Sequence, residues 1–291
     1  MSTTTHMGRI VSFWRYPVKS MLGEELNASG LTEGGLIGDR AFALIDSSNG
    51  KTASAKNPTK WKSLFDCRAA FVQPPLKAEE LPPVRITLPN GTTVLSDRSD
   101  VHEILSSVCG RAVKLMAAAP GPPVLEEYWP DVEGLAHKET VTDESIAASA
   151  PRGTFFDYAV VHILTTNTLE RLRELYPQGR FETRRFRPNI VIQADGEQKA
   201  FVENHWVGKT LRLGDQVVLQ VTDPCARCVM TTLPQGDLPA DTGILRTAAQ
   251  HNKVIGGEAS GPEGVYPAVV GVYARVLNGG ILRRGDGVRL E

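Results

Sequence analysis

Residues 222–232 contain the side chains of this chain that are best suited to chemistry. Two thiols, Cys225 and Cys228, flank Arg227 directly after the apolar run at residues 217–221, and the 291-residue chain has only four cysteines. A neighbouring cation favours the thiolate, which is the form of cysteine that attacks electrophiles and binds soft metals. The segment therefore predicts a reactive or metal-binding thiol at the end of a β-strand.

The two thiols alone are compatible with three other kinds of site. The Cys-x-x-Cys spacing matches a thiol–disulfide enzyme, but such a pair belongs at a helix N-terminus in a βαβ unit, whereas the flanks here are β-branched residues and Pro234. A structural zinc ion needs four ligands, and Cys67, Cys109 and the scattered histidines offer no second pair. The third alternative is a pair of buried core thiols. The residues alone do not decide among these.

Three cationic segments offer hydrogen-bond donors for an anion. Lys19 and Ser20 follow a strand-like run, Arg40 ends a Gly-Asp-Arg turn, and three arginines surround Phe186 in residues 184–187 ahead of an apolar strand. The planar guanidinium of arginine suits bidentate binding of a phosphate. Each segment taken alone is equally compatible with a solvated loop or a basic surface edge, so only their convergence in space would indicate a site.

The composition is that of an ordinary soluble protein, and it narrows the function classes. Hydrophobic residues make up 41% and charged residues 22%, and the 32 basic residues nearly balance the 33 acidic ones. This balance argues against a nucleic-acid or anionic-membrane partner. No run approaches the roughly 20 apolar residues of a membrane span, and the N-terminus lacks the basic and apolar regions of a secretory signal. With four cysteines, too few for a disulfide scaffold, these features predict a cytoplasmic protein.

Short β-strands dominate the expected secondary structure. The expected strands of the first two thirds of the chain lie at residues 9–15, 41–46, 84–88, 92–95 and 158–164. An Asn-Gly pair between the third and fourth of these is a hairpin signal. One helix is expected between Ser99 as N-cap and Gly110 as stop, and a second is expected to open with Asn167 and Glu170 as a capping pair.

The C-terminal part contains an internal sequence repeat. Residues 211–220 and 282–291 share a pattern of strand, Gly-Asp turn and strand, and an Asn-Gly-Gly run predicts a hairpin between residues 269–276 and Ile281. Many short strands with few helices favour a β-barrel or sandwich over a parallel βαβ sheet. Residues 117–153 are rich in Pro, Gly and acids and are expected to be a linker or a long covering loop.

Taken in order, the motifs resemble those of the MOSC-domain family, the molybdenum cofactor sulfurase C-terminal type. The landmarks are Tyr-Pro-Val-Lys-Ser near the start, Gly-Asp-Arg, Phe-Arg-Pro-Asn, and Cys-x-Arg-Cys followed by Thr-Thr. Nearly the whole chain is similar to amidoxime-reducing enzymes that have a MOSC N-terminal domain. The resemblance implies a mainly β fold with some α, in which a β-rich MOSC N-terminal domain (residues 8–116) packs on a MOSC β-barrel (residues 154–291), with segment 117–153 between them.

The resemblance also implies a cofactor and the residues that hold it. The cofactor is the molybdenum cofactor, a molybdopterin, and Cys228 is its metal ligand and the catalytic residue, since a soft thiolate suits molybdenum. The other cofactor-binding residues that it implies are Lys19, Ser20, Arg40, Thr165, Asn167, Thr168, Arg187, Asn189 and Arg227. Cys225 stands where the family often has a cysteine that is not a ligand. A phosphorylated pterin needs convergent cationic donors, which would unite the three cationic segments.

The implied function is reduction of small N-hydroxylated molecules, of the amidoxime, hydroxylamine or N-oxide type. Some bacterial relatives carry a C-terminal ferredoxin domain with four cysteines, and this chain does not, so a separate ferredoxin-, flavin- or b-type cytochrome-like protein is expected to supply electrons. Neither a nucleic acid nor a membrane is expected as a partner. The alternative is a protein that binds or carries the molybdenum cofactor or sulfur, the latter as a persulfide on Cys228.

Overall fold

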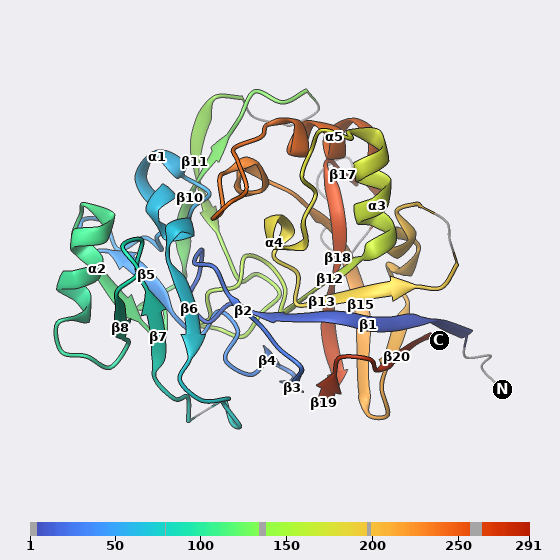
Figure 1. The fold of residues 1–291 in the computed structure, drawn as a ribbon, viewed down its shortest axis with the longest axis horizontal. Coiled ribbons are helices and arrows are strands. Elements are labelled where there is room, and N and C mark those ends of the chain that lie inside the picture. Colours follow the sequence, from blue (N-terminus) through green and yellow to red (C-terminus); the bar gives the residue numbers. More distant parts are fainter. Residues whose placement is uncertain (1–4, 79, 134–137, 197–198, 257–263) are drawn as a thin grey trace.

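One half of the molecule is a closed barrel of seven β-strands, which confirms the β-barrel that the family resemblance implies (Figure 1). The computed structural model describes residues 5–78, 80–133, 138–196, 199–256 and 264–291. Around the barrel the strands are β1 (Thr5–Arg15), β13 (Ile190–Ala194), β12 (Val161–Thr165), β18 (Val269–Asn278), β15 (Val217–Ala226), β14 (Thr210–Leu213) and β20 (Gly287–Leu290), which pairs again with β1. Strands β12 and β13 run parallel, and all other neighbours are antiparallel.

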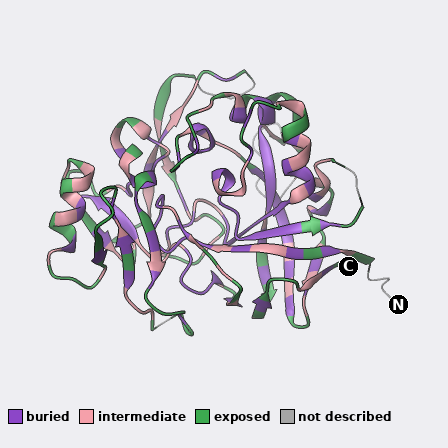
Figure 2. Cartoon of the chain, in the orientation of Figure 1, coloured by how far each residue is buried: buried purple, intermediate pink, exposed green. Residues whose placement is uncertain are grey.

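The alternation of buried and less buried residues along the strands explains the barrel core. On β14 and the first half of β15 every second residue has no exposed surface: Leu211, Leu213, Val217, Leu219 and Val221. A strand points successive side chains to opposite faces, so these five apolar side chains enter one shared core. Figure 2 shows this burial along the barrel strands.

The N-terminal half has a separate core beneath two small sheets and three helical segments. Its elements are β5 (Ala43–Asp46) paired with β9 (Val113–Met116), the sheet β6 (Arg68–Phe71), β7 (Val84–Thr87) and β8 (Thr93–Leu95), and the helices α1 (Pro58–Trp61), η1 (Lys62–Asp66) and α2 (Val101–Cys109). Trp61, Leu64 and Leu105 from the helical segments share one apolar cluster with Val84 and Ile86 of β7. The hairpin of β7 and β8 confirms the predicted one.

Smaller elements join the halves and cover one end of the barrel. They are β2 (Glu24–Glu25), the sheet β19 (Gly280–Arg283), β3 (Ala28–Thr32) and β4 (Gly35–Leu36), the hairpins β10 (Val124–Trp129) with β11 (Thr140–Ser145) and β16 (Val254–Ile255) with β17 (Val265–Tyr266), and the helices α3 (Thr166–Leu175), α4 (Thr183–Phe186), η2 (Val202–Trp206), η3 (Val229–Thr232) and α5 (Gly243–His251). Segment 117–153, predicted as a linker or covering loop, therefore contains the β10–β11 hairpin.

Both predicted helices form, but their first residues differ from the prediction. Asp100 precedes α2 in place of Ser99, and Gly110 ends α2 in the left-handed conformation at φ 65°. The N-cap of α3 is Thr165, whose extended backbone lets its Oγ1 accept a hydrogen bond from the amide of Thr168 at 3.1 Å. Asn167 already lies inside that helix, so the predicted capping pair is wrong.

Only the first copy of the internal sequence repeat forms a hairpin. Residues 211–220 form the hairpin of β14 and β15, but β19 pairs with β3 instead of folding back on β18. The glycines of the predicted turn allow this path, because a Cβ on Gly279 would lie 2.5 Å from the carbonyl oxygen of Leu31 in β3. The Asn-Gly-Gly signal therefore marks a close approach between strands, and the predicted β18–β19 hairpin is wrong.

Candidate functional site

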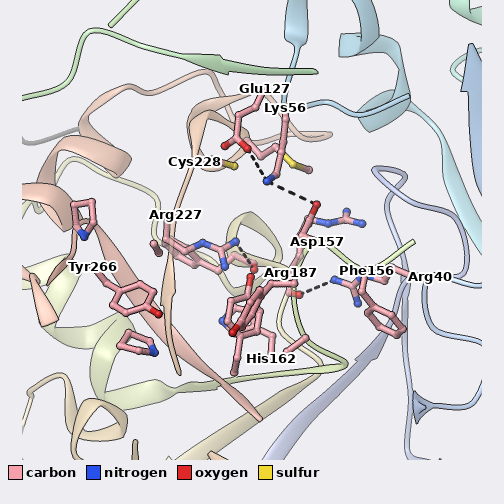
Figure 3. A pocket seen from close by; sticks show the side chains of 18 of the residues that line it. Arg40, Lys56, Glu127, Phe156, Asp157, His162, Arg187, Arg227, Cys228 and Tyr266 are labelled. Carbon is pink, nitrogen blue, oxygen red and sulfur yellow. Dashed lines mark hydrogen bonds and ion pairs between the residues drawn. The ribbon is translucent and has the colours of Figure 1, made fainter. Parts of the chain in front are cut away.

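A cavity of about 450 Å³ lies where the two halves meet (Figure 3). The N-terminal half contributes Arg40 and Lys56, the β10–β11 hairpin contributes Glu127, and the barrel contributes Arg227 and Cys228. Five of the ten residues implied as site residues line it: Arg40, Arg187, Asn189, Arg227 and Cys228. Residues more than 180 positions apart in the chain therefore share one cavity.

Two consecutive β-bulges bring the cysteine segment to this cavity. The pairing of β15 with β18 skips Thr222, and then Cys225 opposite residues 270 and 271, before the strand ends at Ala226. A bulge inserts one unpaired residue and redirects the chain that follows it. As a result Cys225 is fully buried, whereas Cys228 is half-buried and lines the cavity.

Arg227 interacts differently with the two thiols. Its Nη1 donates a hydrogen bond to Cys225 Sγ at 2.7 Å, and its Nη2 donates to the carbonyl oxygen of Phe186 at 2.8 Å. Burial, aided by the negative charge of Glu127, raises the pKa of the Cys228 thiol to about 11, although Lys56 and Arg227 act in the opposite direction. Arg227 thus favours the thiolate of Cys228, as predicted, but burial outweighs this effect and the thiol stays protonated at neutral pH. A soft metal would have to displace that proton.

The guanidinium groups of Arg40 and Arg187 both lie over the ring of Tyr16. Their guanidinium carbons lie 4.4 Å and 4.2 Å from the ring centroid, and both residues have a left-handed backbone, with φ of 48° and 54°. Left-handed non-glycine residues cost free energy and concentrate at functional positions. Arg40 pairs with Asp39 at 2.5 Å, but Arg187 donates to the carbonyl oxygen of Met21 at 2.7 Å. Burial, together with the charge of Arg40, lowers the pKa of Arg187 to about 10.

Asn189 connects the turn that contains Asp39 and Arg40 to barrel strand β12. Its Nδ2 donates to Asp39 Oδ2 at 2.9 Å, and its Oδ1 accepts from the amide of His162 at 3.0 Å. Burial, with help from Arg227, lowers the pKa of His162 to about 3, so its ring is neutral; its Nε2 lies 3.1 Å from the carbonyl oxygen of Val270. His162 is buried in β12, and it also lines the cavity.

Comparison with family models identifies the kind of protein that has this fold. The model of the MOSC domain matches residues 151–289, and the model of the MOSC N-terminal beta barrel domain matches residues 7–61. The chain belongs to the MOSC family. A search of curated proteins found no significant match.

Solved structures similar to this MOSC protein have low sequence identity to it. The YUAD protein from Bacillus subtilis is 8% identical, with a TM-score of 0.45 over 100% of this chain and 98% of that chain. YiiM from Geobacillus stearothermophilus is 18% identical, with a TM-score of 0.30 over 46% of this chain and 54% of that one. YiiM from Escherichia coli is 14% identical, with a TM-score of 0.31 over the same shares. No helix within the described part of the MOSC protein is long and apolar enough to cross a membrane.

Lys19 and Ser20 lie behind the cavity wall instead of lining it. Lys19 Nζ donates to the carbonyl oxygen of Phe155 at 2.8 Å and to Asp157 Oδ1 at 2.7 Å. Ser20 Oγ accepts from the amide of Ala55 at 3.1 Å. These contacts hold the segments that carry Asp157 and Lys56, both of which line the cavity. The motif at the start of this MOSC protein therefore positions wall residues.

Thr165, Asn167 and Thr168 lie away from the cavity, at the N-terminus of α3. The hydroxyls of Thr165 and Thr168 both donate to Glu203 Oε2 at 2.6 Å. All three residues are buried, and none is part of the cavity lining. The hydroxyls of the two threonines thus bind the buried carboxylate of Glu203.

Sequence reasoning missed a chain of charges that reaches the cavity. Lys56 Nζ lies 2.8 Å from Glu127 Oε2 and 3.8 Å from Asp157 Oδ1, which in turn pairs with Lys19 at 2.7 Å. Glu126 on the same strand binds Lys60 at 2.6 Å. The sequence signal that could have predicted these ion pairs is the pair of adjacent glutamates in β10. They lie in a segment expected to be a loop, and they form ion pairs with the lysines of residues 51–60.

Proposed function

We propose that this MOSC protein holds a molybdenum cofactor in the cavity and uses it to reduce small N-oxygenated molecules, such as amidoximes, hydroxylamines and N-oxides. The observation that carries the proposal is the surroundings of Cys228. It is the cysteine that lines the cavity, and Arg187 and Arg227, which line the same cavity, form no ion pair with any carboxylate of the described residues. A soft ligand beside cations that form no ion pair suits a metal carried by an anionic organic group.

The donor set fits a phosphorylated pterin. The Nε of Arg227 is buried and has no hydrogen-bond partner among the described residues. Leaving a buried donor unpaired costs about 1–3 kcal/mol, a cost that an acceptor on a ligand would remove. Arg187 and Arg40 add two guanidiniums at the same cavity, and guanidinium binds phosphate oxygens in pairs.

Each residue has a distinct part in this proposal. Cys228 would hold the metal, and Arg40, Arg187 and Arg227 would bind the anionic pterin. When bound, molybdenum supplies two-electron redox chemistry coupled to transfer of an oxygen atom. The Sγ proton of Cys228 has to leave first, and the charges of Lys56 and Arg227 both favour that loss. A separate ferredoxin-, flavin- or b-type cytochrome-like electron donor and a cytoplasmic location belong to the same proposal.

The test is metal analysis with pterin fluorescence on protein made in a host that synthesises the cofactor. We expect molybdenum and oxidised pterin in equal, stoichiometric amounts, and N-oxide reduction when a reduced viologen dye supplies electrons. Protein free of molybdenum that carries a persulfide on Cys228 would replace this proposal with the sulfur-carrier alternative. Stoichiometric cofactor without any reduction would instead favour cofactor storage and delivery.

A further inference from the structure

The cavity has a second, aromatic side that the cofactor residues do not occupy. This side, called the aromatic wall here, consists of Trp129, Tyr158, Tyr266 and Tyr273. Its members come from the β10–β11 hairpin, the segment before β12, β17 and β18. All four side chains are half-buried, as expected for residues that face an open cavity. Figure 3 places Tyr266 on the far side of Arg227 from Arg40.

Internal contacts hold the rings of the aromatic wall in place. Tyr158 and Tyr273 lie with centroids 5.4 Å apart and planes inclined by 54°. The hydroxyls of Tyr158 and Tyr266 donate to the two oxygens of Asp223, at 3.1 Å to Oδ2 and 3.0 Å to Oδ1. Asp223 lies between the two bulges of β15 and is 1% exposed. One carboxylate thus fixes two rings from separate elements.

Hydrogen bonds inside the protein use the polar hydrogens of three of the four residues of the aromatic wall. A phenol has one hydrogen, and in Tyr158 and Tyr266 it is directed to Asp223. The indole N–H of Trp129 donates to Thr142 Oγ1 at 2.8 Å. These three residues therefore contribute aromatic rings to the cavity lining and no spare donor. A ligand carboxylate placed there would lose its hydration without gaining a hydrogen bond from them, and it would approach the negative charge of Asp223.

We infer that the aromatic wall is the substrate subsite and that it selects a flat, uncharged aromatic molecule bearing the N–O group over an anionic one. The inference rests on the proposed function and specifies its substrate class. Stacking and edge-to-face contacts with ordered rings favour a planar aromatic ligand. The cationic residues Arg40 and Arg187 take the anionic cofactor on the other side, so the two sides would orient cofactor and substrate toward each other. Asp223 is the positioning residue for this subsite.

Binding to cofactor-free protein, with inorganic phosphate added to occupy the guanidinium groups of the cationic side, tests the inference with three probes of graded chemistry. Pyridine N-oxide is flat and neutral, nicotinic acid N-oxide adds a carboxylate to the same ring, and trimethylamine N-oxide has no ring. By calorimetry we expect pyridine N-oxide to bind roughly tenfold more tightly than either of the other two. Equal affinity for pyridine N-oxide and nicotinic acid N-oxide would overturn the inference.

Two variants locate the preference on the wall. Trp129→Leu should abolish the advantage of pyridine N-oxide over trimethylamine N-oxide. Tyr266→Phe keeps the ring but removes one hydrogen bond from Asp223, so binding of the cation N-methylpyridinium should rise several-fold, by roughly the effect of one charged contact. The control Tyr176→Phe, whose hydroxyl faces Asp241 in a different part of the molecule, should leave all affinities unchanged. Unchanged probe affinities in both wall variants would contradict the inference.

Turnover separates this inference from the proposed function. If the molybdenum-loaded protein binds pyridine N-oxide with the expected preference but does not reduce it, the reductase proposal fails and the subsite stands. If it reduces all three N-oxides with equal KM, the reductase proposal stands and the subsite fails.

Discussion

The two cysteines at the end of β15 are three positions apart and have opposite environments. Cys225 is fully buried and accepts a hydrogen bond from Arg227, whereas Cys228 opens into the cavity beside Lys56 and Glu127. The bulge at Cys225 separates them. The Cys-x-x-Cys spacing therefore does not by itself indicate a shared function, because an irregularity in strand pairing places the two thiols in different environments.

Chemical labelling should reveal the largest difference between the two thiols. Iodoacetamide at pH 9 should modify Cys228 at least about 100-fold faster than Cys225, because only local unfolding exposes Cys225. Site-resolved mass spectrometry gives both rates in one sample. Equal rates would mean that the bulge does not separate the two thiols as described.

Removal of Cys225 should damage stability more than removal of Cys228. Cys225→Ala creates a cavity and leaves Arg227 Nη1 without its acceptor, so we expect a loss of about 2–3 kcal/mol in the free energy of unfolding. Cys228→Ala should cost less than about 1 kcal/mol, since its side chain already borders open space. Urea unfolding of both variants measures the difference. The control Cys225→Ser keeps an acceptor for Arg227 and should lose less than Cys225→Ala.

The pH dependence of labelling should distinguish Cys228 by the position of its pKa. A pKa of about 11 means that the thiolate fraction at Cys228 grows with pH throughout the accessible range. Its alkylation rate should therefore rise about tenfold per pH unit from pH 7 to pH 10 without a plateau, since the thiolate is the reactive form. A plateau below pH 9 would show that burial does not dominate the environment of this thiol.

A smaller effect should follow from the lysine next to Cys228. Lys56 lowers the pKa of this thiol, so Lys56→Met should slow alkylation of Cys228 at pH 9 by about threefold, the size expected from the loss of one partly screened charge. Lys56→Arg keeps the charge and serves as the matched control. Faster alkylation in Lys56→Met would indicate that opening of the β10–β11 hairpin, and not charge, controls access to the thiol.

The residues of the site differ in how far sequence could predict them. Arg187, Asn189, Arg227 and Cys228 stand in short motifs, and the cavity brings them together with Arg40. Lys56 and Glu127 belong to no such motif. They can be recognised as site residues only from the ion pair between them, which joins positions 71 residues apart. The strand patterns predicted a β-barrel or a sandwich, and the resemblance to the MOSC family decided for the barrel.

Some of the strand pairings could not be predicted from the local sequence. The Asn-Gly-Gly run before β19 has the composition of a hairpin turn, yet its glycines serve the close approach to Leu31. The β10–β11 hairpin was hidden because its acidic residues resemble a solvated loop until the lysines opposite them are known. In both cases the deciding partner lies far away in the chain.

Molybdenum content of three proteins purified side by side from a cofactor-producing host tests the central claim most directly. The unmodified chain and Cys225→Ser should contain stoichiometric molybdenum, and Cys228→Ser should contain almost none or release it on gel filtration. Full retention of molybdenum by Cys228→Ser would contradict the account, because the metal would then be held by some group other than the thiol that faces the cavity.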